Sequence, residues 1–170
     1  MTFPCLISSY IIRAGLPVSL KNSPIDAPAK GAYTCIGASK NSIVFTKSAT
    51  ESINLVAESW GYDNLKSGDV VLLTDMEHHS NIIPWQIICN KTGAKIKYLK
   101  STEQGTINLD DLRSSLDKNV KMVSITHASN VFGTINPIKE ITNIVKKNAQ
   151  KIINTSCNSR SKTPPNIFKS

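Results

Sequence analysis

Two adjacent histidines, His78 and His79, stand where a short apolar stretch of the sequence ends. The stretch at residues 69–74 (DVVLLT) follows a glycine and is rich in valine and leucine, which is typical of a buried strand. Pro84 suits the first turn of the helix that follows. The histidines therefore fall in a strand-to-helix loop, and open α/β sheets bind ligands at the carboxyl ends of their strands.

Residue type alone leaves several interpretations of this histidine pair open. An imidazole at a strand end can stack on a planar ligand or act as an acid or base. Adjacent residues do not share a helix face, and no further His or Cys lies at ligand spacing, so we expect no metal site. A hydrogen-bonded loop histidine without a chemical role is the plain alternative.

Two further strand-to-helix loops carry residue types that bind ligands. In residues 47–51 (KSATE), hydroxyls and backbone N–H groups precede a helix and favour a phosphate, unless Ser48 or Thr50 only caps that helix. In residues 126–134 (THASNVFGT), Asn130 offers a donor and an acceptor, unless it forms an Asx turn within its own loop. Parallel strands end at one rim, so the three loops are expected to gather there.

Strands and helices alternate through the middle of the chain, which predicts an α/β fold with a mostly parallel sheet flanked by helices. Residues 1–35 show no sustained hydrophobic period of a helix or a strand. From Thr155 onward the sequence is polar and basic with paired prolines, which predicts a frayed tail. The predicted strands are residues 42–46, 69–74, 94–99, 120–126 and about 151–153, and the predicted helices are residues 51–60, 83–91, 109–116 and 137–147.

Length and composition fit one domain. At 170 residues and 40% hydrophobic content the chain can bury a core, and no segment is typical of a membrane span. The first 20 residues lack a basic start and are interrupted by Pro4, Arg13 and Pro17, so a signal peptide is not expected. The four cysteines form no CxxC pair, which favours free thiols in a reducing cytoplasm.

The net charge of +8 belongs to the two ends of the chain. Residues 1–47 carry +4 and residues 146–170 carry +6, whereas residues 48–145 carry −2. No aromatic residues interleave with the basic ones, as a base-stacking platform requires. We therefore expect no nucleic-acid partner.

Three motifs in the middle resemble the class V aminotransferase family, most closely its cysteine desulfurases of the SufS type. They are FTKSATESINLVAESWG, MEHHSNIIPWQ and ITHASNVFGTINPI, in the family's order and spacing. The resemblance implies an incomplete part of the large domain of a fold-type I pyridoxal-phosphate enzyme over residues 36–150. It leaves residues 1–35 as a divergent, irregular segment and residues 151–170 as a basic tail outside the family. The activity it implies is sulfur transfer from L-cysteine for iron–sulfur cluster assembly.

The same resemblance implies a role for each loop. Ala49 and Thr50 match the positions that hold the phosphate of pyridoxal 5'-phosphate. His78 matches the histidine that stacks on the pyridine ring, and Asn130 matches the asparagine that contacts the phenolic oxygen. His127 lies in the same motif near the cofactor. Many relatives have threonine where this chain has Ala49, so one phosphate contact is expected to be lost.

The sequence departs from the family where the chemistry is done. Residues 154–158 read NTSCN in place of the family's Asp-Gly-Ala-Gln, whose aspartate pairs with the pyridinium nitrogen. Without that carboxylate the ring is a poor electron sink. The Schiff-base lysine, the nucleophilic cysteine loop and the small domain have no counterpart, so no catalytic residue is expected.

We expect a truncated or frameshifted product, such as that of a pseudogene, that is inactive alone and binds the cofactor weakly and noncovalently. The alternative is a non-catalytic assembly piece that pairs with a complementary chain or forms a dimer with itself or a full-length homologue. Half of a doubly wound sheet is expected to leave apolar faces and a strand edge uncovered.

Overall fold

The computed structural model describes residue 44, residues 46–148 and residues 150–156. Our expectations for residues 1–35 and 157–170 lie outside this range. So does most of the strand predicted at residues 42–46, of which only Val44 and Thr46 are described.

Four parallel strands form one sheet in the order β2-β1-β3-β4. The strands are β1 (Val70–Thr74), β2 (Lys95–Leu99), β3 (Val120–Ala128) and β4 (Lys151–Ser156). The central strands β1 and β3 are near-continuous apolar runs, as expected for strands that are buried on both faces. The predicted parallel α/β sheet is confirmed.

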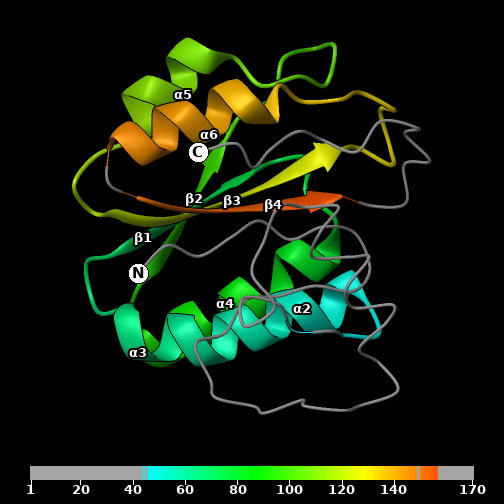
Figure 1. The fold of residues 1–170 in the computed structure, drawn as a ribbon. Coiled ribbons are helices and arrows are strands. Elements are labelled where there is room, and N and C mark those ends of the chain that lie inside the picture. Colours follow the sequence, from blue (N-terminus) through cyan, green and yellow to red (C-terminus); the bar gives the residue numbers. More distant parts are fainter. Residues whose placement is uncertain (1–43, 45, 149, 157–170) are drawn as a thin grey trace, which may run out of the picture.

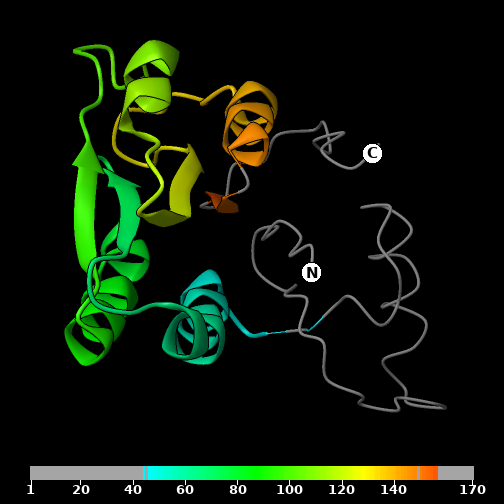
Figure 2. The same ribbon diagram turned by 90° about the vertical axis from the view of Figure 1, so that its left-hand side faces the viewer.

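Helices cover both faces of the sheet (Figure 1). Figure 2 shows the resulting three layers from the side. One face carries α2 (Ala49–Val56), the π-helical turn η2 (Ala57–Gly61), α3 (Tyr62–Asn64), the 3-10 turn η3 (His79–Asn81) and α4 (Ile83–Thr92), and the other carries α5 (Leu109–Ser115) and α6 (Ile138–Lys147).

Each face of the sheet has its own apolar core, because side chains alternate along the strands. Val71 and Leu73 of β1 pack with Trp85 of α4 on one face. Leu72, between them, packs with Ile141 of α6 on the other face. All five side chains are fully buried. The expectation of uncovered apolar faces is therefore wrong for the central strands, which the described helices cover on both sides.

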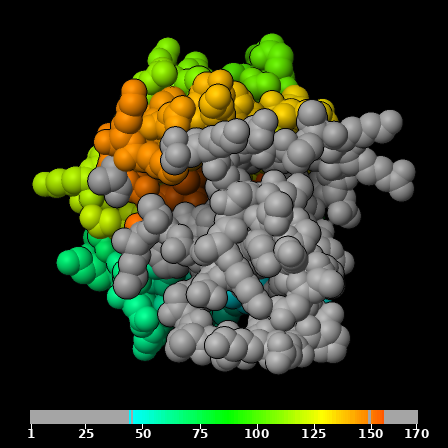
Figure 3. Space-filling view, viewed as in Figure 1, coloured from blue at the N-terminus to red at the C-terminus, as the bar shows by residue number. Residues whose placement is uncertain are grey.

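The strand β4 continues to Ser156, although a frayed tail was predicted from Thr155. Its pairing with β3 joins Thr126 to Thr155 and Ala128 to Ser156, with a bulge between the two pairs. The sheet thus extends past the boundary at residue 150 that we placed between domain and tail. Figure 3 shows α6 packed against this strand.

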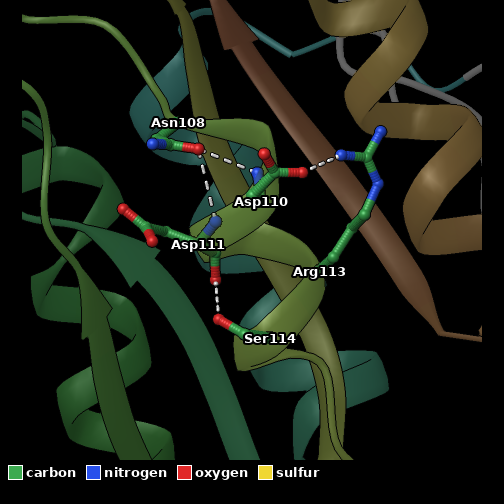
Figure 4. A network of polar contacts seen from close by, with 5 residues as sticks. All are labelled: Asn108, Asp110, Asp111, Arg113 and Ser114. Atoms are coloured by element: carbon green, nitrogen blue, oxygen red, sulfur yellow. Dashed lines mark hydrogen bonds and ion pairs between the residues drawn. The ribbon is translucent and has the colours of Figure 1, made fainter.

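The helix α5 begins at Leu109, the first residue of the predicted helix, and Asn108 caps it. Asn108 Oδ1 accepts hydrogen bonds from the backbone N–H groups of Asp110 and Asp111, at 2.8 and 3.4 Å (Figure 4). The two acids also favour the positive end of the helix dipole. Arg113 contacts Asp110 at 2.5 Å, but both side chains are exposed, so the ion pair adds little stability.

The first helix does not end at residue 60, where the predicted range ends, but continues through Gly61. Its backbone is helical, with φ −62° and ψ −44°, and the helical path continues to Asn64. A Cβ at Gly61 would lie 3.2 Å from the side chain of Ile88. The glycine therefore serves the close approach of α4 and does not terminate the helix.

Gly105→Ala should lower the free energy of unfolding more than Gly68→Ala does. Both glycines have positive φ, 69° and 90°, so either alanine incurs roughly 1–2 kcal/mol of backbone strain. Only at Gly105 does a new Cβ meet a neighbour, the Phe132 ring at 2.5 Å, whereas nothing lies within 4 Å at Gly68. Urea unfolding followed by circular dichroism measures both variants, and equal losses would contradict the crowding argument.

Candidate functional site

The three loops singled out from the sequence meet at one rim of the sheet. His78 follows β1 and Asn130 follows β3, and these strands are parallel neighbours. The start of α2 lies on the same side as the arrowheads of β3 and β4 (Figure 1), and α2 contacts η3. The predicted clustering of the loops is confirmed, while the cofactor roles of their residues stay predictions.

The start of α2 combines a cap with free donors. Ser48 Oγ accepts a hydrogen bond from Glu51 N at 3.1 Å, so Ser48 does cap the helix, as the plain alternative proposed. The backbone N–H groups of Ala49 and Thr50 have no partner among the described residues, and the Thr50 side chain is exposed. The cap and an anion site are therefore compatible at this helix end.

His78 is held at one ring nitrogen and is otherwise exposed. Its Nδ1 accepts a hydrogen bond from Ser80 N at 3.2 Å and lies 2.9 Å from Ser80 Oγ. Because Nδ1 accepts, Nε2 carries the proton of the neutral ring. The His79 ring stands edge-on to it, with ring centroids 6.2 Å apart. The loop thus presents an oriented imidazole at the rim.

Asn130 is exposed, and its loop is ordered by a different residue. Ser129 Oγ accepts from the N–H groups of Val131 and Phe132 at 3.3 and 3.2 Å. The Asx-turn alternative for Asn130 is therefore wrong, and its amide has no partner among the described residues. His127 is half-buried beside the bulge of β3, and desolvation by burial lowers the pKa of its imidazole.

A buried polar network beneath the rim was missed in the sequence. Glu77, which is 7% exposed, contacts Thr74, Asn81 and Thr126. Desolvation raises the pKa of the Glu77 carboxyl, and these hydrogen bonds oppose the rise. The spacing of Glu77, Asn81 and Trp85 at four-residue steps was a visible signal of one side-chain row.

The described part of β4 offers no group for a pyridinium nitrogen. Residues 151–156 contain no carboxylate. Asn154 is buried and its amide nitrogen lies 3.5 Å from Thr142 Oγ1 of α6, on the face opposite α4. The residues present thus fit a phosphate and an aromatic ring, but not the partner of a ring nitrogen.

Comparison with known proteins decides the family. The family model for class-V aminotransferases matches residues 29–165. The chain belongs to the class-V aminotransferase family. It is 41% identical over 129 residues to a probable cysteine desulfurase of Synechocystis sp., covering 76% of this chain and 31% of that protein. It is 50% identical over 99 residues to a cysteine desulfurase of Cronobacter sakazakii, covering 58% and 24%.

Solved structures of this pyridoxal-phosphate-dependent family match the fold. A cysteine desulfurase of Thermococcus onnurineus superposes with a TM-score of 0.71 at 34% identity, covering 76% of this chain and 32% of that one. The Escherichia coli cysteine desulfurase CsdA gives 0.73 at 23% identity, covering 81% and 37%. SspA, solved in complex with cysteine, gives 0.66 at 22% identity, covering 81% and 42%.

The chain spans about a quarter to a third of the length of the curated relatives it matches. Its sheet matches part of the fold-type I architecture of cysteine desulfurases. Within the described range, no three His, Cys, Asp or Glu side chains gather as a metal site requires. None of the helices described there is long and apolar enough to cross a membrane.

Cys89 should resist alkylation by iodoacetamide at neutral pH while the chain is folded. The thiolate is the reactive form, and burial raises the pKa of the Cys89 thiol to about 11. The residue is also only 4% exposed, within the core between α4 and the sheet. Peptide mass spectrometry of the labelled chain, with and without urea, measures the modification. Labelling of folded Cys89 at the rate of free cysteine would contradict its place in the core.

Proposed function

We propose that this chain forms the phosphate and ring contacts of a pyridoxal-phosphate site of the cysteine desulfurase type, and that these 170 residues alone do not desulfurate L-cysteine. The observation that carries the proposal is the meeting of the α2 start, the His78 loop and the Asn130 loop at one rim of a parallel sheet. Such rims are where open α/β sheets bind their ligands.

The phosphate is assigned to the start of α2. Two backbone N–H groups and the Thr50 hydroxyl are available there, and the helix dipole favours an anion at this end. Ala49 contributes only its N–H, because its side chain has no hydroxyl. The Glu51 carboxylate accepts a hydrogen bond from Lys47 N at 2.7 Å, so this negative charge is held near residue 47.

The ring is assigned to His78 and Asn130. Stacking an imidazole on a planar heteroaromatic ring orients it and excludes water from one face. Asn130 can donate from its amide nitrogen to the phenolic oxygen, and His127, with its lowered pKa, adds a neutral imidazole near the same strand end. A bound pyridoxal phosphate would supply an electron sink for reactions at the α-carbon of an amino acid.

The reaction itself needs groups that the described residues do not offer. Residues 151–156 contain no carboxylate, so the described part of β4 offers none that would keep the ring nitrogen protonated. Cys89 is buried with a raised pKa and cannot serve as a sulfur-accepting thiolate. The similarity to cysteine desulfurases makes L-cysteine the proposed substrate. The location of the protein in a reducing cytoplasm stays a prediction.

A second candidate function is assembly with another chain. Within the described sheet β2 is bonded on one side only, to β1, and its Tyr98 is 44% exposed. Such a piece can extend its sheet against a complementary chain or a full-length homologue. Native mass spectrometry of the chain mixed with a full-length cysteine desulfurase tests this, and the absence of any complex at equimolar mixing would dismiss it.

His78→Ala should weaken binding of pyridoxal phosphate about three- to tenfold, which is the worth of one stacked aromatic contact. His79→Ala is the matched control, because it removes the neighbouring imidazole but no assigned contact. Equilibrium dialysis followed by cofactor absorbance measures both constants. Equal affinities of the two variants would refute the assignment of the ring to His78.

The purified chain with added pyridoxal phosphate should release sulfide from L-cysteine no faster than the free cofactor does. The expectation follows from the missing carboxylate and from the buried thiol of Cys89. Colorimetric sulfide detection with a full-length cysteine desulfurase as positive control measures the rate. Turnover clearly above the cofactor blank would overturn the inactive part of the proposal.

A further inference from the structure

The carboxylate of Glu77 joins two segments that are far apart in the sequence. Its Oε1 accepts hydrogen bonds from Thr74 Oγ1 at 2.5 Å and from the backbone N–H of Thr126 at 2.8 Å. Its Oε2 accepts from Asn81 Nδ2 at 2.8 Å. All three partners are donors, so an ionised carboxylate satisfies them and nothing else of its size does.

The amide of Asn81 has only one possible orientation in this network. Its Oδ1 accepts hydrogen bonds from Trp85 Nε1 at 3.2 Å and from Ser124 Oγ at 2.6 Å. An indole N–H can only donate, so this side of the amide must be the oxygen. The amide nitrogen therefore faces Glu77, and the residue is 1% exposed, so no water can replace either partner.

We propose that Glu77 is a positioning residue that holds the imidazole of His78 at the rim, in register with the end of β3 that carries Asn130. The proposal deepens the proposed cofactor site and rests on it for its functional meaning. His78 directly follows Glu77 in the chain. The carboxylate is bonded to Thr126 of β3, and Asn130 lies four residues after Thr126, just beyond the end of that strand.

The position of His78 relative to β3 depends on this bond, because the ring's own hydrogen bonds are local and the loop's anchor at Asp75 leads to Leu99 of β2 and to Ser101. Among the residues that the structure describes, the ring is hydrogen-bonded only to Ser80, two residues away, and this contact would move with the loop. The Glu77 carboxylate connects the loop to β3 through its hydrogen bond from Thr126 N. A second link to β3 runs from Asn81 to Ser124, and the nitrogen of the same amide donates to the carboxylate.

An amide cannot replace the carboxylate in this setting. In Glu77→Gln, the new NH₂ group faces either Asn81 Nδ2 or Thr126 N, and both are donors. A buried donor facing a donor leaves both groups unsatisfied. Asn81→Asp alone places two buried carboxylates against each other, which is equally unfavourable.

The double exchange Glu77→Gln with Asn81→Asp restores every bond. The glutamine introduced at position 77 would accept through its oxygen from Thr74 and Thr126, and it would donate through its nitrogen to the carboxylate introduced at position 81. That carboxylate would keep accepting from Trp85 and Ser124. The exchange also conserves the net charge of the network, so the comparison isolates hydrogen-bond direction.

The test measures the full chain in four forms: unchanged, Glu77→Gln, Asn81→Asp and the double exchange. Glu58→Gln, the same chemical change at an exposed position, is the matched control. Histidine ring ¹⁵N NMR reads the tautomer and titration of His78 among the 3 histidines, with His78→Ala for assignment. Equilibrium dialysis reads binding of pyridoxal phosphate.

We expect each single exchange to change the His78 ring signals and to weaken cofactor binding about tenfold, with both restored in the double exchange. Folded Glu77→Gln with unchanged ring signals would overturn the proposal, and so would a folded double exchange that restores neither readout. If Glu77→Gln does not fold, Thr74→Val removes one of the three bonds and keeps the carboxylate. It should then shift the ring signals of His78 by a smaller amount, and no shift would overturn the proposal.

The two proposals fail in different ways. If the unchanged chain binds no pyridoxal phosphate, the proposed function fails, while the His78 ring signals still decide the role of Glu77. If the chain binds the cofactor but Glu77→Gln leaves the ring signals unchanged, the positioning role fails and the cofactor site stands.

Discussion

The parallel direction of the four described strands is the constraint on which the rest of this structure depends. Parallel strands cannot be joined by tight hairpins, so each connection crosses the sheet and includes a helix. These helices bury both faces, which is why Val71, Leu72 and Leu73 are all inaccessible although successive side chains point to opposite sides. The same direction puts every strand's carboxyl end at one rim, and polar loop residues collect there.

The sequence predicted those parts of the fold whose signals are local. The β1 run, the start of α4 at Ile83 and the start of α5 at Leu109 each depend on residues within a few positions, and all three are confirmed. The errors have tertiary causes. Gly61 resembles a helix stop, yet it is needed for the approach of Ile88, and the end of β4 depends on pairing with β3 across a bulge. Neither contact can be predicted from the local pattern of one sequence, because both join residues that are far apart in the chain.

The candidate site divides in the same way. His78 and Asn130 could be found because each follows an apolar run, and strand ends of a parallel sheet are known to converge. Glu77 and Asn81 are four residues apart, which is the spacing of neighbouring side chains on a helix, so their contact could be predicted from the sequence. Their partners on β3 could not, because Thr126 and Ser124 lie 49 and 43 residues away in the chain. Only the register of β1 with β3 brings these groups together.

The buried carboxylate beneath the rim is better explained by geometry than by stability. Removing a charge from water is unfavourable, the pKa of Glu77 is raised by its burial, and a well-packed apolar group often serves stability equally well. Three hydrogen bonds of 2.5–2.8 Å define one relative position of the carboxylate and its donors. An apolar contact cannot do this, because only hydrogen bonds are directional. Sites where a local rule of core composition is broken are expected to be functional. Here the broken rule lies directly beneath His78, and the imidazole at the rim is what the network orients.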